Sequence, residues 1–321
     1  MERENGYLNL DLLQSRIKIK EYALRKKGAI YAIKLDDTDY YFKECSYQDA
    51  ITELVVSEML SKIDIPNVKY DLTQYKHKKG VTSRSFKKDG FRYISGREIL
   101  DNYIKALEDE CKKAKGTPFG EISLEEYERY KNDVDAKHTV NNLELIMHAV
   151  EYHVKDRDDA VDEKYKILNT IVTYHLADIL LSNQDRNRSN WVIEESDDYI
   201  GVVPAFDNAD SFKDKNWMAL RVQPIGDDLH PTNTYTEFEE FIARSDKRYL
   251  ERFAEMREKL SIDTLEECIK IVEGKIKCEI RPDVKKKIID FYRVHLEKID
   301  GIFQKRCKKS DSLDDSDFGN R

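Results

Sequence analysis

The spacing of hydrophobic residues divides the chain into an early part with short apolar runs and a later part with helical periodicity. In the early part, residues 29–34 and 40–43 are strand-like runs, and the turn-rich residues 35–39 connect them. Two such runs joined by a turn predict a β-hairpin. Because side chains alternate between the two faces of a strand, Lys43 lies at a strand end on the same face as Tyr41. This position allows Lys43 to project into a cleft.

A helix is expected directly after this hairpin. Ser46 followed by Asp49 resembles a capping-box start, and the residues after it carry an apolar stripe at helical spacing, made of Val56, Met59, Leu60 and Ile63. Glu53 borders the stripe, where an unpaired carboxylate would be costly to bury. An ion pair between Glu53 and Lys43 would remove this cost, and Glu58 on the opposite edge is a competing partner for Lys43. The remaining alternative is that both acids face solvent.

From about residue 97 onward, apolar positions recur at helical spacing. Helices are expected at residues 98–107, 124–134, 141–153, 165–181, 238–260, 264–273 and 283–305. Residues 306–321 are polar, charged and poor in apolar side chains, which predicts a disordered tail. A strand-rich part followed by a helical part predicts an α+β fold.

The main chemical signal follows the helix at residues 165–181. Asp185 and Asn190 are five residues apart in a polar loop, two short strand-like runs come next, and Asp207 stands just after the second run. Phosphoryl transfer needs a carboxylate that orients the attacking oxygen, and oxygen ligands that bind Mg²⁺. Asp and Asn are also frequent turn residues, so their spacing alone does not identify a site. The order of helix, loop, hairpin and Asp is what points to a kinase.

These residues together resemble the HipA-like serine/threonine kinases, which are related to the phosphoinositide 3- and 4-kinases. The resemblance is carried by Lys43, Glu53, the Ile65-Pro66 turn, the loop Asn183-x-Asp185-Arg186-x3-Asn190, and Phe206-Asp207. It covers most of residues 20–215 and is specific only at the loop and at Asp207. The loop also resembles that of type II phosphatidylinositol 4-kinases.

The resemblance implies a bilobal protein-kinase-like fold. It places a small β-rich N-lobe at residues 1–86 and a larger, mainly helical C-lobe at residues 87–305, followed by the tail at residues 306–321. The nucleotide would bind between the two lobes, so ATP and Mg²⁺ are the expected cofactors.

The resemblance also implies a role for each matching residue. Asp185 would orient the acceptor hydroxyl and accept its proton, and Asn190 and Asp207 would bind Mg²⁺. Lys43 would hold the α- and β-phosphates of ATP, and Glu53 would position Lys43. Residues 81–86 would be the strand and hinge whose backbone reads adenine, so the expected ATP-binding residues there are Ser83, Arg84, Ser85 and Phe86.

Two phosphate-contacting features depart from the family pattern. Asn187 stands where HipA-like and phosphoinositide kinases often have His, and Arg186 or Arg188 is expected to compensate by contacting the transferred phosphoryl group. No Gly-x-Gly-x-x-Gly loop precedes the first strand. Residues 25–28 are the only turn-like candidate for a phosphate-binding loop, with a solvated turn as the alternative.

The segment around the predicted metal-binding Asp207 departs as well. Asn208 and Ala209 follow Asp207 where kinases commonly have a nearby glycine. Without that glycine, lower backbone freedom is expected around Asp207. The change removes no oxygen ligand, so Asp207 keeps its expected role.

Composition and charge narrow the expected partners and location. The 321 residues suffice for two lobes, and 55 Lys plus Arg against 63 Asp plus Glu, a formal net charge of -8, argue against a general nucleic-acid binder. The five cysteines are scattered without Cys-x-x-Cys spacing, which is typical of reduced thiols in a cytosol. No apolar run reaches the roughly 20 residues that span a bilayer, and signal-peptide character is lacking. A cytoplasmic location without a membrane anchor is expected.

The sequence favours an ATP- and Mg²⁺-dependent protein serine/threonine kinase whose substrate is another protein or the chain itself. A lipid or small-molecule kinase is the first alternative, although no polybasic cluster or membrane-binding amphipathic helix is evident. An inactive nucleotide-binding or interaction module is the second, and the joint retention of Lys43, Asp185, Asn190 and Asp207 argues against it. A HipA-like toxin would usually imply a DNA-binding antitoxin partner, and nothing in the sequence shows one.

Overall fold

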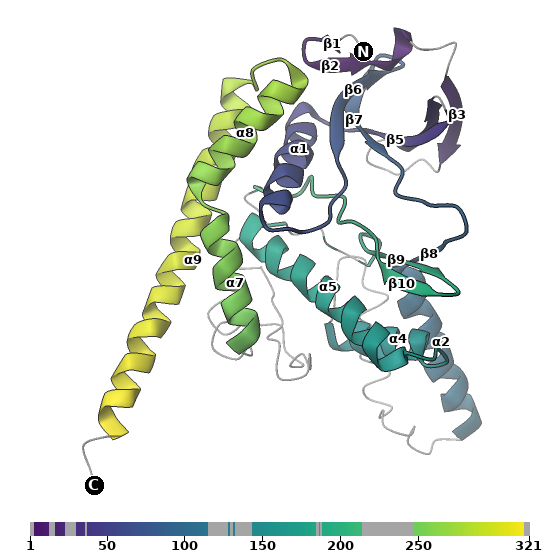
Figure 1. Cartoon of the computed structure of the whole chain (residues 1–321), viewed down its shortest axis with the longest axis vertical. Helices are drawn as coiled ribbons and strands as arrows, with labels where there is room; N and C mark the ends of the chain where they lie inside the picture. The colour runs from purple at the N-terminus through teal and green to yellow at the C-terminus, as the bar shows by residue number, and fades with distance from the viewer. Residues whose placement is uncertain are drawn as a thin grey trace.

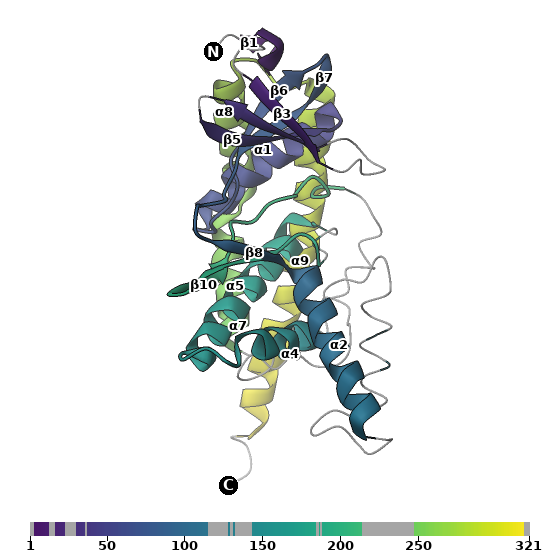
Figure 2. The ribbon, with the colours of Figure 1, turned by 90° about the vertical axis from the view of Figure 1, so that its right-hand side faces the viewer.

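The fold consists of one large sheet, one small sheet and a set of helices that connect and flank them. The computed structural model of the chain describes residues 3–12, 17–22, 30–35, 37–114, 128, 131, 143–183, 186, 188–213 and 247–317. A seven-stranded sheet lies at one end, a three-stranded sheet lies further along, and helices fill the other end (Figures 1 and 2). Strands therefore dominate the early part of the chain and helices the later part.

The large sheet contains the predicted hairpin. Its strands are β1 (Arg3–Glu4), β2 (Tyr7–Asn9), β3 (Ile17–Tyr22), β4 (Ile30–Leu35), β5 (Thr38–Glu44), β6 (Tyr70–Tyr75) and β7 (Lys78–Arg84), in the order β1-β2-β6-β7-β5-β4-β3. Neighbouring strands are antiparallel except β2 and β6. In the predicted hairpin of β4 and β5, Leu35 pairs with Thr38, and Asp37 has a positive φ of 62° at the turn.

Helix α1 (Tyr47–Lys62) follows the hairpin and packs against β6 and β7. It begins as predicted, with the Ser46 Oγ accepting a hydrogen bond from the backbone N–H of Asp49 at 3.1 Å. The helix is buried on more than the predicted stripe, because α8 (Ile262–Ile276) lies along its other side (Figure 1). Tertiary packing on both sides, rather than a single apolar stripe, therefore holds α1 in place.

Ion pairs join α1 to α8. Lys62 lies 2.7 Å from Glu267, and Lys275 lies 2.7 Å from Glu58. Glu58 therefore pairs toward α8 and is not the partner of Lys43. The predicted boundary between lobes at residue 86 stays a prediction, but α8, which belongs to the predicted C-lobe, contacts α1 of the predicted N-lobe.

The small sheet and three helices form the next layer (Figure 2). Its strands β8 (Arg92–Ser95), β9 (Val192–Ser196) and β10 (Tyr199–Val202) are antiparallel in the order β10-β9-β8, and the helices are α2 (Gly96–Ala114), α4 (Leu143–Val154) and α5 (Ala160–Leu181). A glycine is required at the start of α2, since a Cβ at Gly96 would lie 2.0 Å from Cε2 of the buried Trp191. The helices expected at residues 98–107, 141–153 and 165–181 are confirmed.

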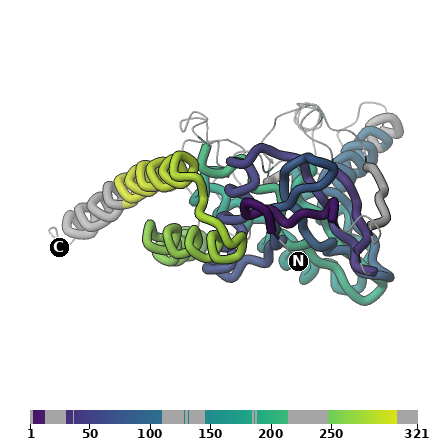
Figure 3. Tube along the Cα trace, turned by 90° about the horizontal axis from the view of Figure 1, so that it is seen from above, coloured from purple at the N-terminus to yellow at the C-terminus, as the bar shows by residue number. Residues whose placement is uncertain are grey.

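The chain ends with α7 (Lys247–Lys259), α8 and α9 (Pro282–Asp317), and Figure 3 shows α8 and α9 side by side on one flank. The helix expected at residues 238–260 is described only from residue 247, and the one expected at residues 124–134 lies outside the described residues except for residues 128 and 131.

Helix α9 corrects one prediction. It continues through residues 306–317, where the sequence predicts a disordered tail. No proline interrupts this stretch, and no glycine occurs between Gly301 and Gly319, so nothing in the local sequence ends the helix. Although α9 is 36 residues long, neither it nor another helix in the described part of the chain is long and apolar enough to cross a membrane.

The buried His295 on α9 is expected to make the free energy of unfolding depend on pH. Its Nε2 donates to the carbonyl oxygen of Ile179 at 2.8 Å, and its side chain is buried. Burial lowers the pKa of His295 from 6.5 to about 4. The unfolded chain therefore binds a proton near pH 6.5, while the native chain does so only near pH 4. The free energy of unfolding should lose about 3 kcal/mol as the pH falls through this window.

The substitution His295→Gln tests this expectation. Gln keeps an N–H donor for the Ile179 carbonyl but does not titrate. Urea unfolding of both proteins between pH 4 and pH 7 should give a flatter stability curve for the variant. Some slope will persist, because burial also lowers the pKa of His175. Identical slopes for the two proteins would show that His295 does not set the pH dependence.

Candidate active site

A cleft of about 1040 Å³ lies where the large sheet, the start of α1 and the later segment 189–213 meet. This volume is just above the roughly 300–1,000 Å³ that is usual for small-molecule sites. The cleft is lined by Ile30, Tyr41, Lys43, Glu44, Cys45, Ser46, Asp49, Tyr70, Lys79, Phe86, Ser189, Asn190, Phe206, Asp207, Ala209, Asp210 and Lys213. The predicted Lys43, Phe86, Asn190 and Asp207, from distant parts of the sequence, therefore share one cavity.

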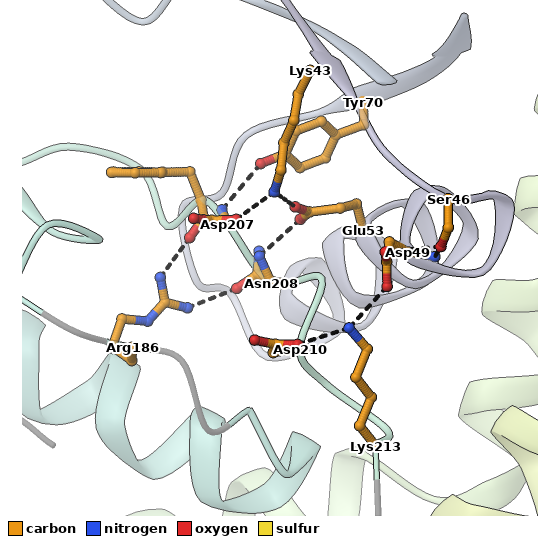
Figure 4. Close-up of polar contacts among 11 residues, drawn as sticks. Lys43, Ser46, Asp49, Glu53, Tyr70, Arg186, Asp207, Asn208, Asp210 and Lys213 are labelled. Carbon is orange, nitrogen blue, oxygen red and sulfur yellow. Dashed lines mark hydrogen bonds and ion pairs between the residues drawn. The ribbon is translucent and has the colours of Figure 1, made fainter. Parts of the chain in front are cut away.

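Lys43 projects from the end of β5 into this cleft. Its Nζ donates to Glu53 Oε1 at 3.0 Å, which is the predicted ion pair, and also to Oδ1 of Asp207 (Figure 4). Burial disfavours the charged ammonium, but the carboxylates of Glu53 and Asp207 outweigh it and raise the pKa of Lys43. Lys43 therefore carries its positive charge at neutral pH.

Gly80 on β7 lets the backbone approach Lys43 closely. A Cβ at Gly80 would lie 2.0 Å from the carbonyl oxygen of Lys43 and 3.0 Å from Cα of Glu44. Both of these neighbours are backbone atoms, so any other residue at this position would push β5 away from β7. The place of Lys43 at the cleft thus depends on a glycine in the neighbouring strand.

Glu53 connects Lys43 to the segment around Asp207. Its side chain is 0% exposed, and its Oε2 accepts a hydrogen bond from the backbone N–H of Asn208 at 2.8 Å. Burial raises the pKa of Glu53, and the positive charge of Lys43 opposes that effect. Both carboxylate oxygens therefore have a partner, as a buried carboxylate requires.

Asp207 has an uncommon backbone conformation. Its φ is 60°, in the left-handed region that, apart from glycine, mainly Asn and Asp adopt. Its backbone N–H donates to the Tyr70 hydroxyl at 3.2 Å, and just before it Ala205 hydrogen-bonds to the carbonyl of Pro66 at 2.8 Å. Although no glycine lies next to Asp207, the backbone takes a left-handed conformation here, and Asp207 itself adopts it. Such conformations cluster at functional sites, where the surrounding structure enforces them.

Arg186 joins three segments beneath the cleft. Its guanidinium pairs with Asp178 of α5, at 2.9 Å from Nε to Oδ2 and 3.0 Å from Nη2 to Oδ1. It also donates to the carbonyl of Phe206 at 2.6 Å. A further bond of 2.6 Å goes to Oδ1 of Asn208 (Figure 4). A weaker bond of 3.3 Å reaches the carbonyl of Asn190. Arg186 therefore fixes the loop and the Asp207 segment relative to α5.

This arrangement corrects one expectation. The guanidinium of Arg186 is only 8% exposed and is committed to Asp178 and the neighbouring carbonyls, so it does not compensate for Asn187 by contacting a phosphoryl group. Asn187 itself lies outside the described residues, and Arg188 remains the alternative. The sequence offered one signal for this network, a charged Asp178 inside the apolar run of α5, because a buried carboxylate needs a cation.

The predicted adenine-binding residues separate into two groups. Ser83 lies inside the sheet, paired with Tyr41 on β5 and Tyr70 on β6, so its backbone faces the neighbouring strands. Arg84 pairs with Tyr40, and the backbone N–H of Ser85 donates to the carbonyl of Asp39 at 2.8 Å. None of these three lines the cleft, whereas Phe86 does.

Phe86 provides an apolar floor at one end of the cleft. Its ring stacks on that of Phe206, with centroids 5.9 Å apart and planes 28° apart. Ile30 and Tyr41 line the same cavity from β4 and β5. Flat aromatic and apolar surfaces of this kind suit a planar base.

The metal-binding residues were predicted as Asn190 and Asp207. Both line the cleft and offer an amide and a carboxylate oxygen, the ligand types that Mg²⁺ prefers. In the described part of the chain no group of three or more His, Cys, Asp or Glu forms a metal site by itself. A Mg²⁺ ion here would need further oxygens from phosphate and water, as is usual for Mg²⁺-nucleotide sites. Asp185, the predicted catalytic residue, and residues 25–28 lie outside the described residues.

Comparison with known proteins supports the fold. No protein-family model matches the sequence, and no curated protein matches it significantly. The structure is similar to that of the Helicobacter pylori proinflammatory kinase CtkA, with a TM-score of 0.52 and 13% identity, over 91% of this chain and 98% of that chain. It is also similar to a chain in the Shewanella oneidensis MR-1 complex of the toxin–antitoxin system HipA, HipB and its operator DNA, with a TM-score of 0.50 and 13% identity.

The second similarity covers 88% of this chain and 62% of the Shewanella chain, so this chain spans less than two thirds of that protein's length. At 13% identity, these similarities establish the fold. They confirm the predicted α+β class, with an N-terminal sheet followed by a helical region, and the predicted HipA-like kinase fold.

Proposed function

We propose that this chain, which has the HipA-like kinase fold, is an ATP- and Mg²⁺-dependent protein serine/threonine kinase. The observation that carries the proposal is the cluster of Lys43, Glu53 and Asp207, in which Lys43 and Asp207 line a cleft of about 1040 Å³ and the buried Glu53 holds Lys43. A half-buried lysine held between two carboxylates supplies a fixed positive charge for a polyphosphate. A left-handed Asp207 beside it supplies a metal-binding carboxylate.

Each residue around the cleft would have a separate role in binding ATP, Mg²⁺ or the acceptor. The base of ATP would lie against Phe86 and Phe206, and Lys43 would contact the phosphates. Asn190 and Asp207 would hold Mg²⁺, which neutralises phosphate charge during transfer. Asp185, whose role rests on its sequence position, would orient the hydroxyl of the acceptor. Most of the catalytic effect would come from positioning and fixed charge, because phosphoryl transfer requires little covalent chemistry from the protein.

Transfer of labelled γ-phosphate from Mg-ATP tests the proposal. The purified protein is incubated alone, with a generic protein substrate, and with phosphatidylinositol vesicles. Label should appear on protein and should fall by about 10²-fold or more in Asp185→Ala and in Asp207→Ala. Asp197→Ala is a matched control, because Asp197 is an exposed carboxylate in the turn between β9 and β10, and it should keep full activity.

The other outcomes separate the alternatives. Label on lipid alone would overturn the protein acceptor but keep the kinase. ATP binding without any transfer would contradict kinase activity toward these acceptors. No ATP binding at all would leave an interaction module with a kinase fold.

A further inference from the structure

We infer that Lys213 and Asp49 form a clasp that holds α1 against the Asp207 segment, and that both are positioning residues for Lys43 and Glu53. The inference rests on the proposed kinase function. Lys213 lies six residues after Asp207 and lines the same cleft. Its Nζ lies 2.8 Å from Asp49 Oδ1 on α1 and 2.7 Å from Asp210 Oδ1 (Figure 4).

The clasp lies one helical turn from the contact made by Glu53. Asp49 and Glu53 are four residues apart on α1, so their side chains lie on the same face of the helix. Glu53 accepts from the backbone of Asn208 at 2.8 Å, and Asp49 pairs with Lys213. The segment 207–213 is therefore attached to one face of α1 at two successive turns.

Asp49 is oriented for this role by its own helix cap. Its Oδ2 accepts a hydrogen bond from Ser46 Oγ at 2.8 Å, and its backbone N–H donates to the same Oγ at 3.1 Å. These contacts leave Oδ1 directed at Lys213. The capping residue thus restrains the Asp49 carboxylate independently of Lys213, which favours one geometry for the pair.

The two attachments differ in accessibility. The Glu53 contact is buried, whereas the side chains of Lys213 and Asp49 are 24% and 29% exposed at the edge of the cleft. Burial disfavours the charged Lys213, but Asp210 and Asp49 raise its pKa, so it is charged at neutral pH. Breaking the ion pair between Lys213 and Asp49 would free the first turn of α1, and Glu53 lies on the next turn. The clasp therefore sets how firmly Glu53 holds Lys43.

The test compares Lys213→Met, Asp49→Asn, their double variant and Lys213→Arg. Lys62→Met is the matched control. Lys62 is also on α1, but its 2.7 Å ion pair is with Glu267 on α8 and not with the Asp207 segment. Two quantities are measured for each protein: kcat and KM for Mg-ATP in phosphoryl transfer, and hydrogen exchange of the α1 backbone. The second quantity does not depend on activity.

Lys213→Met and Asp49→Asn should each lower kcat/KM by about tenfold and speed hydrogen exchange in the first turns of α1. The double variant should be no worse than either single one, Lys213→Arg should stay within about twofold of wild type, and Lys62→Met should match wild type at the start of α1. Additive losses in the double variant, or unchanged exchange in Lys213→Met, would overturn the clasp. Absence of transfer in the wild type would instead contradict the proposed function, and the exchange data would still decide the clasp.

Discussion

Lys43→Met is expected to lower kcat/KM for phosphoryl transfer by about 10²–10³-fold and to destabilise the fold by about 3–5 kcal/mol. The first effect follows from the loss of the fixed cation in the cleft. The second follows from Glu53, whose side chain is 0% exposed and which would lose its cation while remaining near Asp207. Activity assays and urea unfolding at pH 7 measure the two effects separately.

A second substitution separates stability from function at this site. In Lys43→Met/Glu53→Gln the unpaired buried carboxylate is gone, so most of the lost stability should return while kcat/KM stays as low as in Lys43→Met. Lys78→Met is the control, because Lys78 forms a 2.7 Å pair with Glu44 on the same sheet and the two side chains are 40% and 36% exposed. Surface pairs contribute little, so this variant should unfold like wild type. A Lys43→Met protein with normal stability and normal transfer would remove Lys43 and Glu53 from the proposed machinery.

The pairing of Lys43 with Glu53 could be predicted because its geometry is local. A hairpin sets the strand end, and a helix capped by Ser46 begins three residues later, so ten residues of sequence bring the ammonium and the carboxylate together. The same local logic placed Asp207 after the second strand of the β9–β10 hairpin. Patterns of this kind depend on periodicity and caps, which are visible in the sequence.

Long-range register could not be predicted in the same way. Ser83 was expected to read adenine, but its pairing with both Tyr41 and Tyr70 depends on which strands flank β7. The sequence shows where a strand lies and not which neighbours it has. The burial of α1 has the same origin, since α8, which covers it, is about two hundred residues away in the chain.

The hydrogen-bond network of Arg186 depends partly on a local sequence pattern and partly on long-range contacts. Asp178 was visible as a charge within an apolar helix, but the choice of Arg186 as its partner required the fold to bring α5, the loop and the Asp207 segment together. Asn208 stands in the segment where kinases commonly have a glycine. Only the structure shows that its Oδ1 accepts a hydrogen bond from Arg186 and that its backbone N–H donates one to Glu53. The residue that departs from the family pattern thus links the loop to α1.

Arg186→Met is therefore expected to destabilise the protein by about 3–5 kcal/mol, because it leaves Asp178 buried without its cation. The carbonyl of Phe206 and the side chain of Asn208 would also lose their donors. Arg257→Ala is the matched control. Arg257 forms a similar two-point pair with Asp300, whose side chain is 42% exposed, so its loss should cost less than about 1 kcal/mol. Urea unfolding at pH 7 measures both values.

The double variant Arg186→Met/Asp178→Asn decides whether Arg186 acts only on stability. It removes the unpaired charge, and the introduced asparagine would keep an oxygen for the Asn183 amide that now donates to Asp178 at 2.9 Å. Much of the stability should return, yet Phe206 and Asn208 would still lack the guanidinium that anchors them. Transfer by the folded double variant should therefore remain about tenfold or more below wild type. If activity returned together with stability, Arg186 would contribute only to the stability of the fold and would not hold Asp207 in its left-handed conformation.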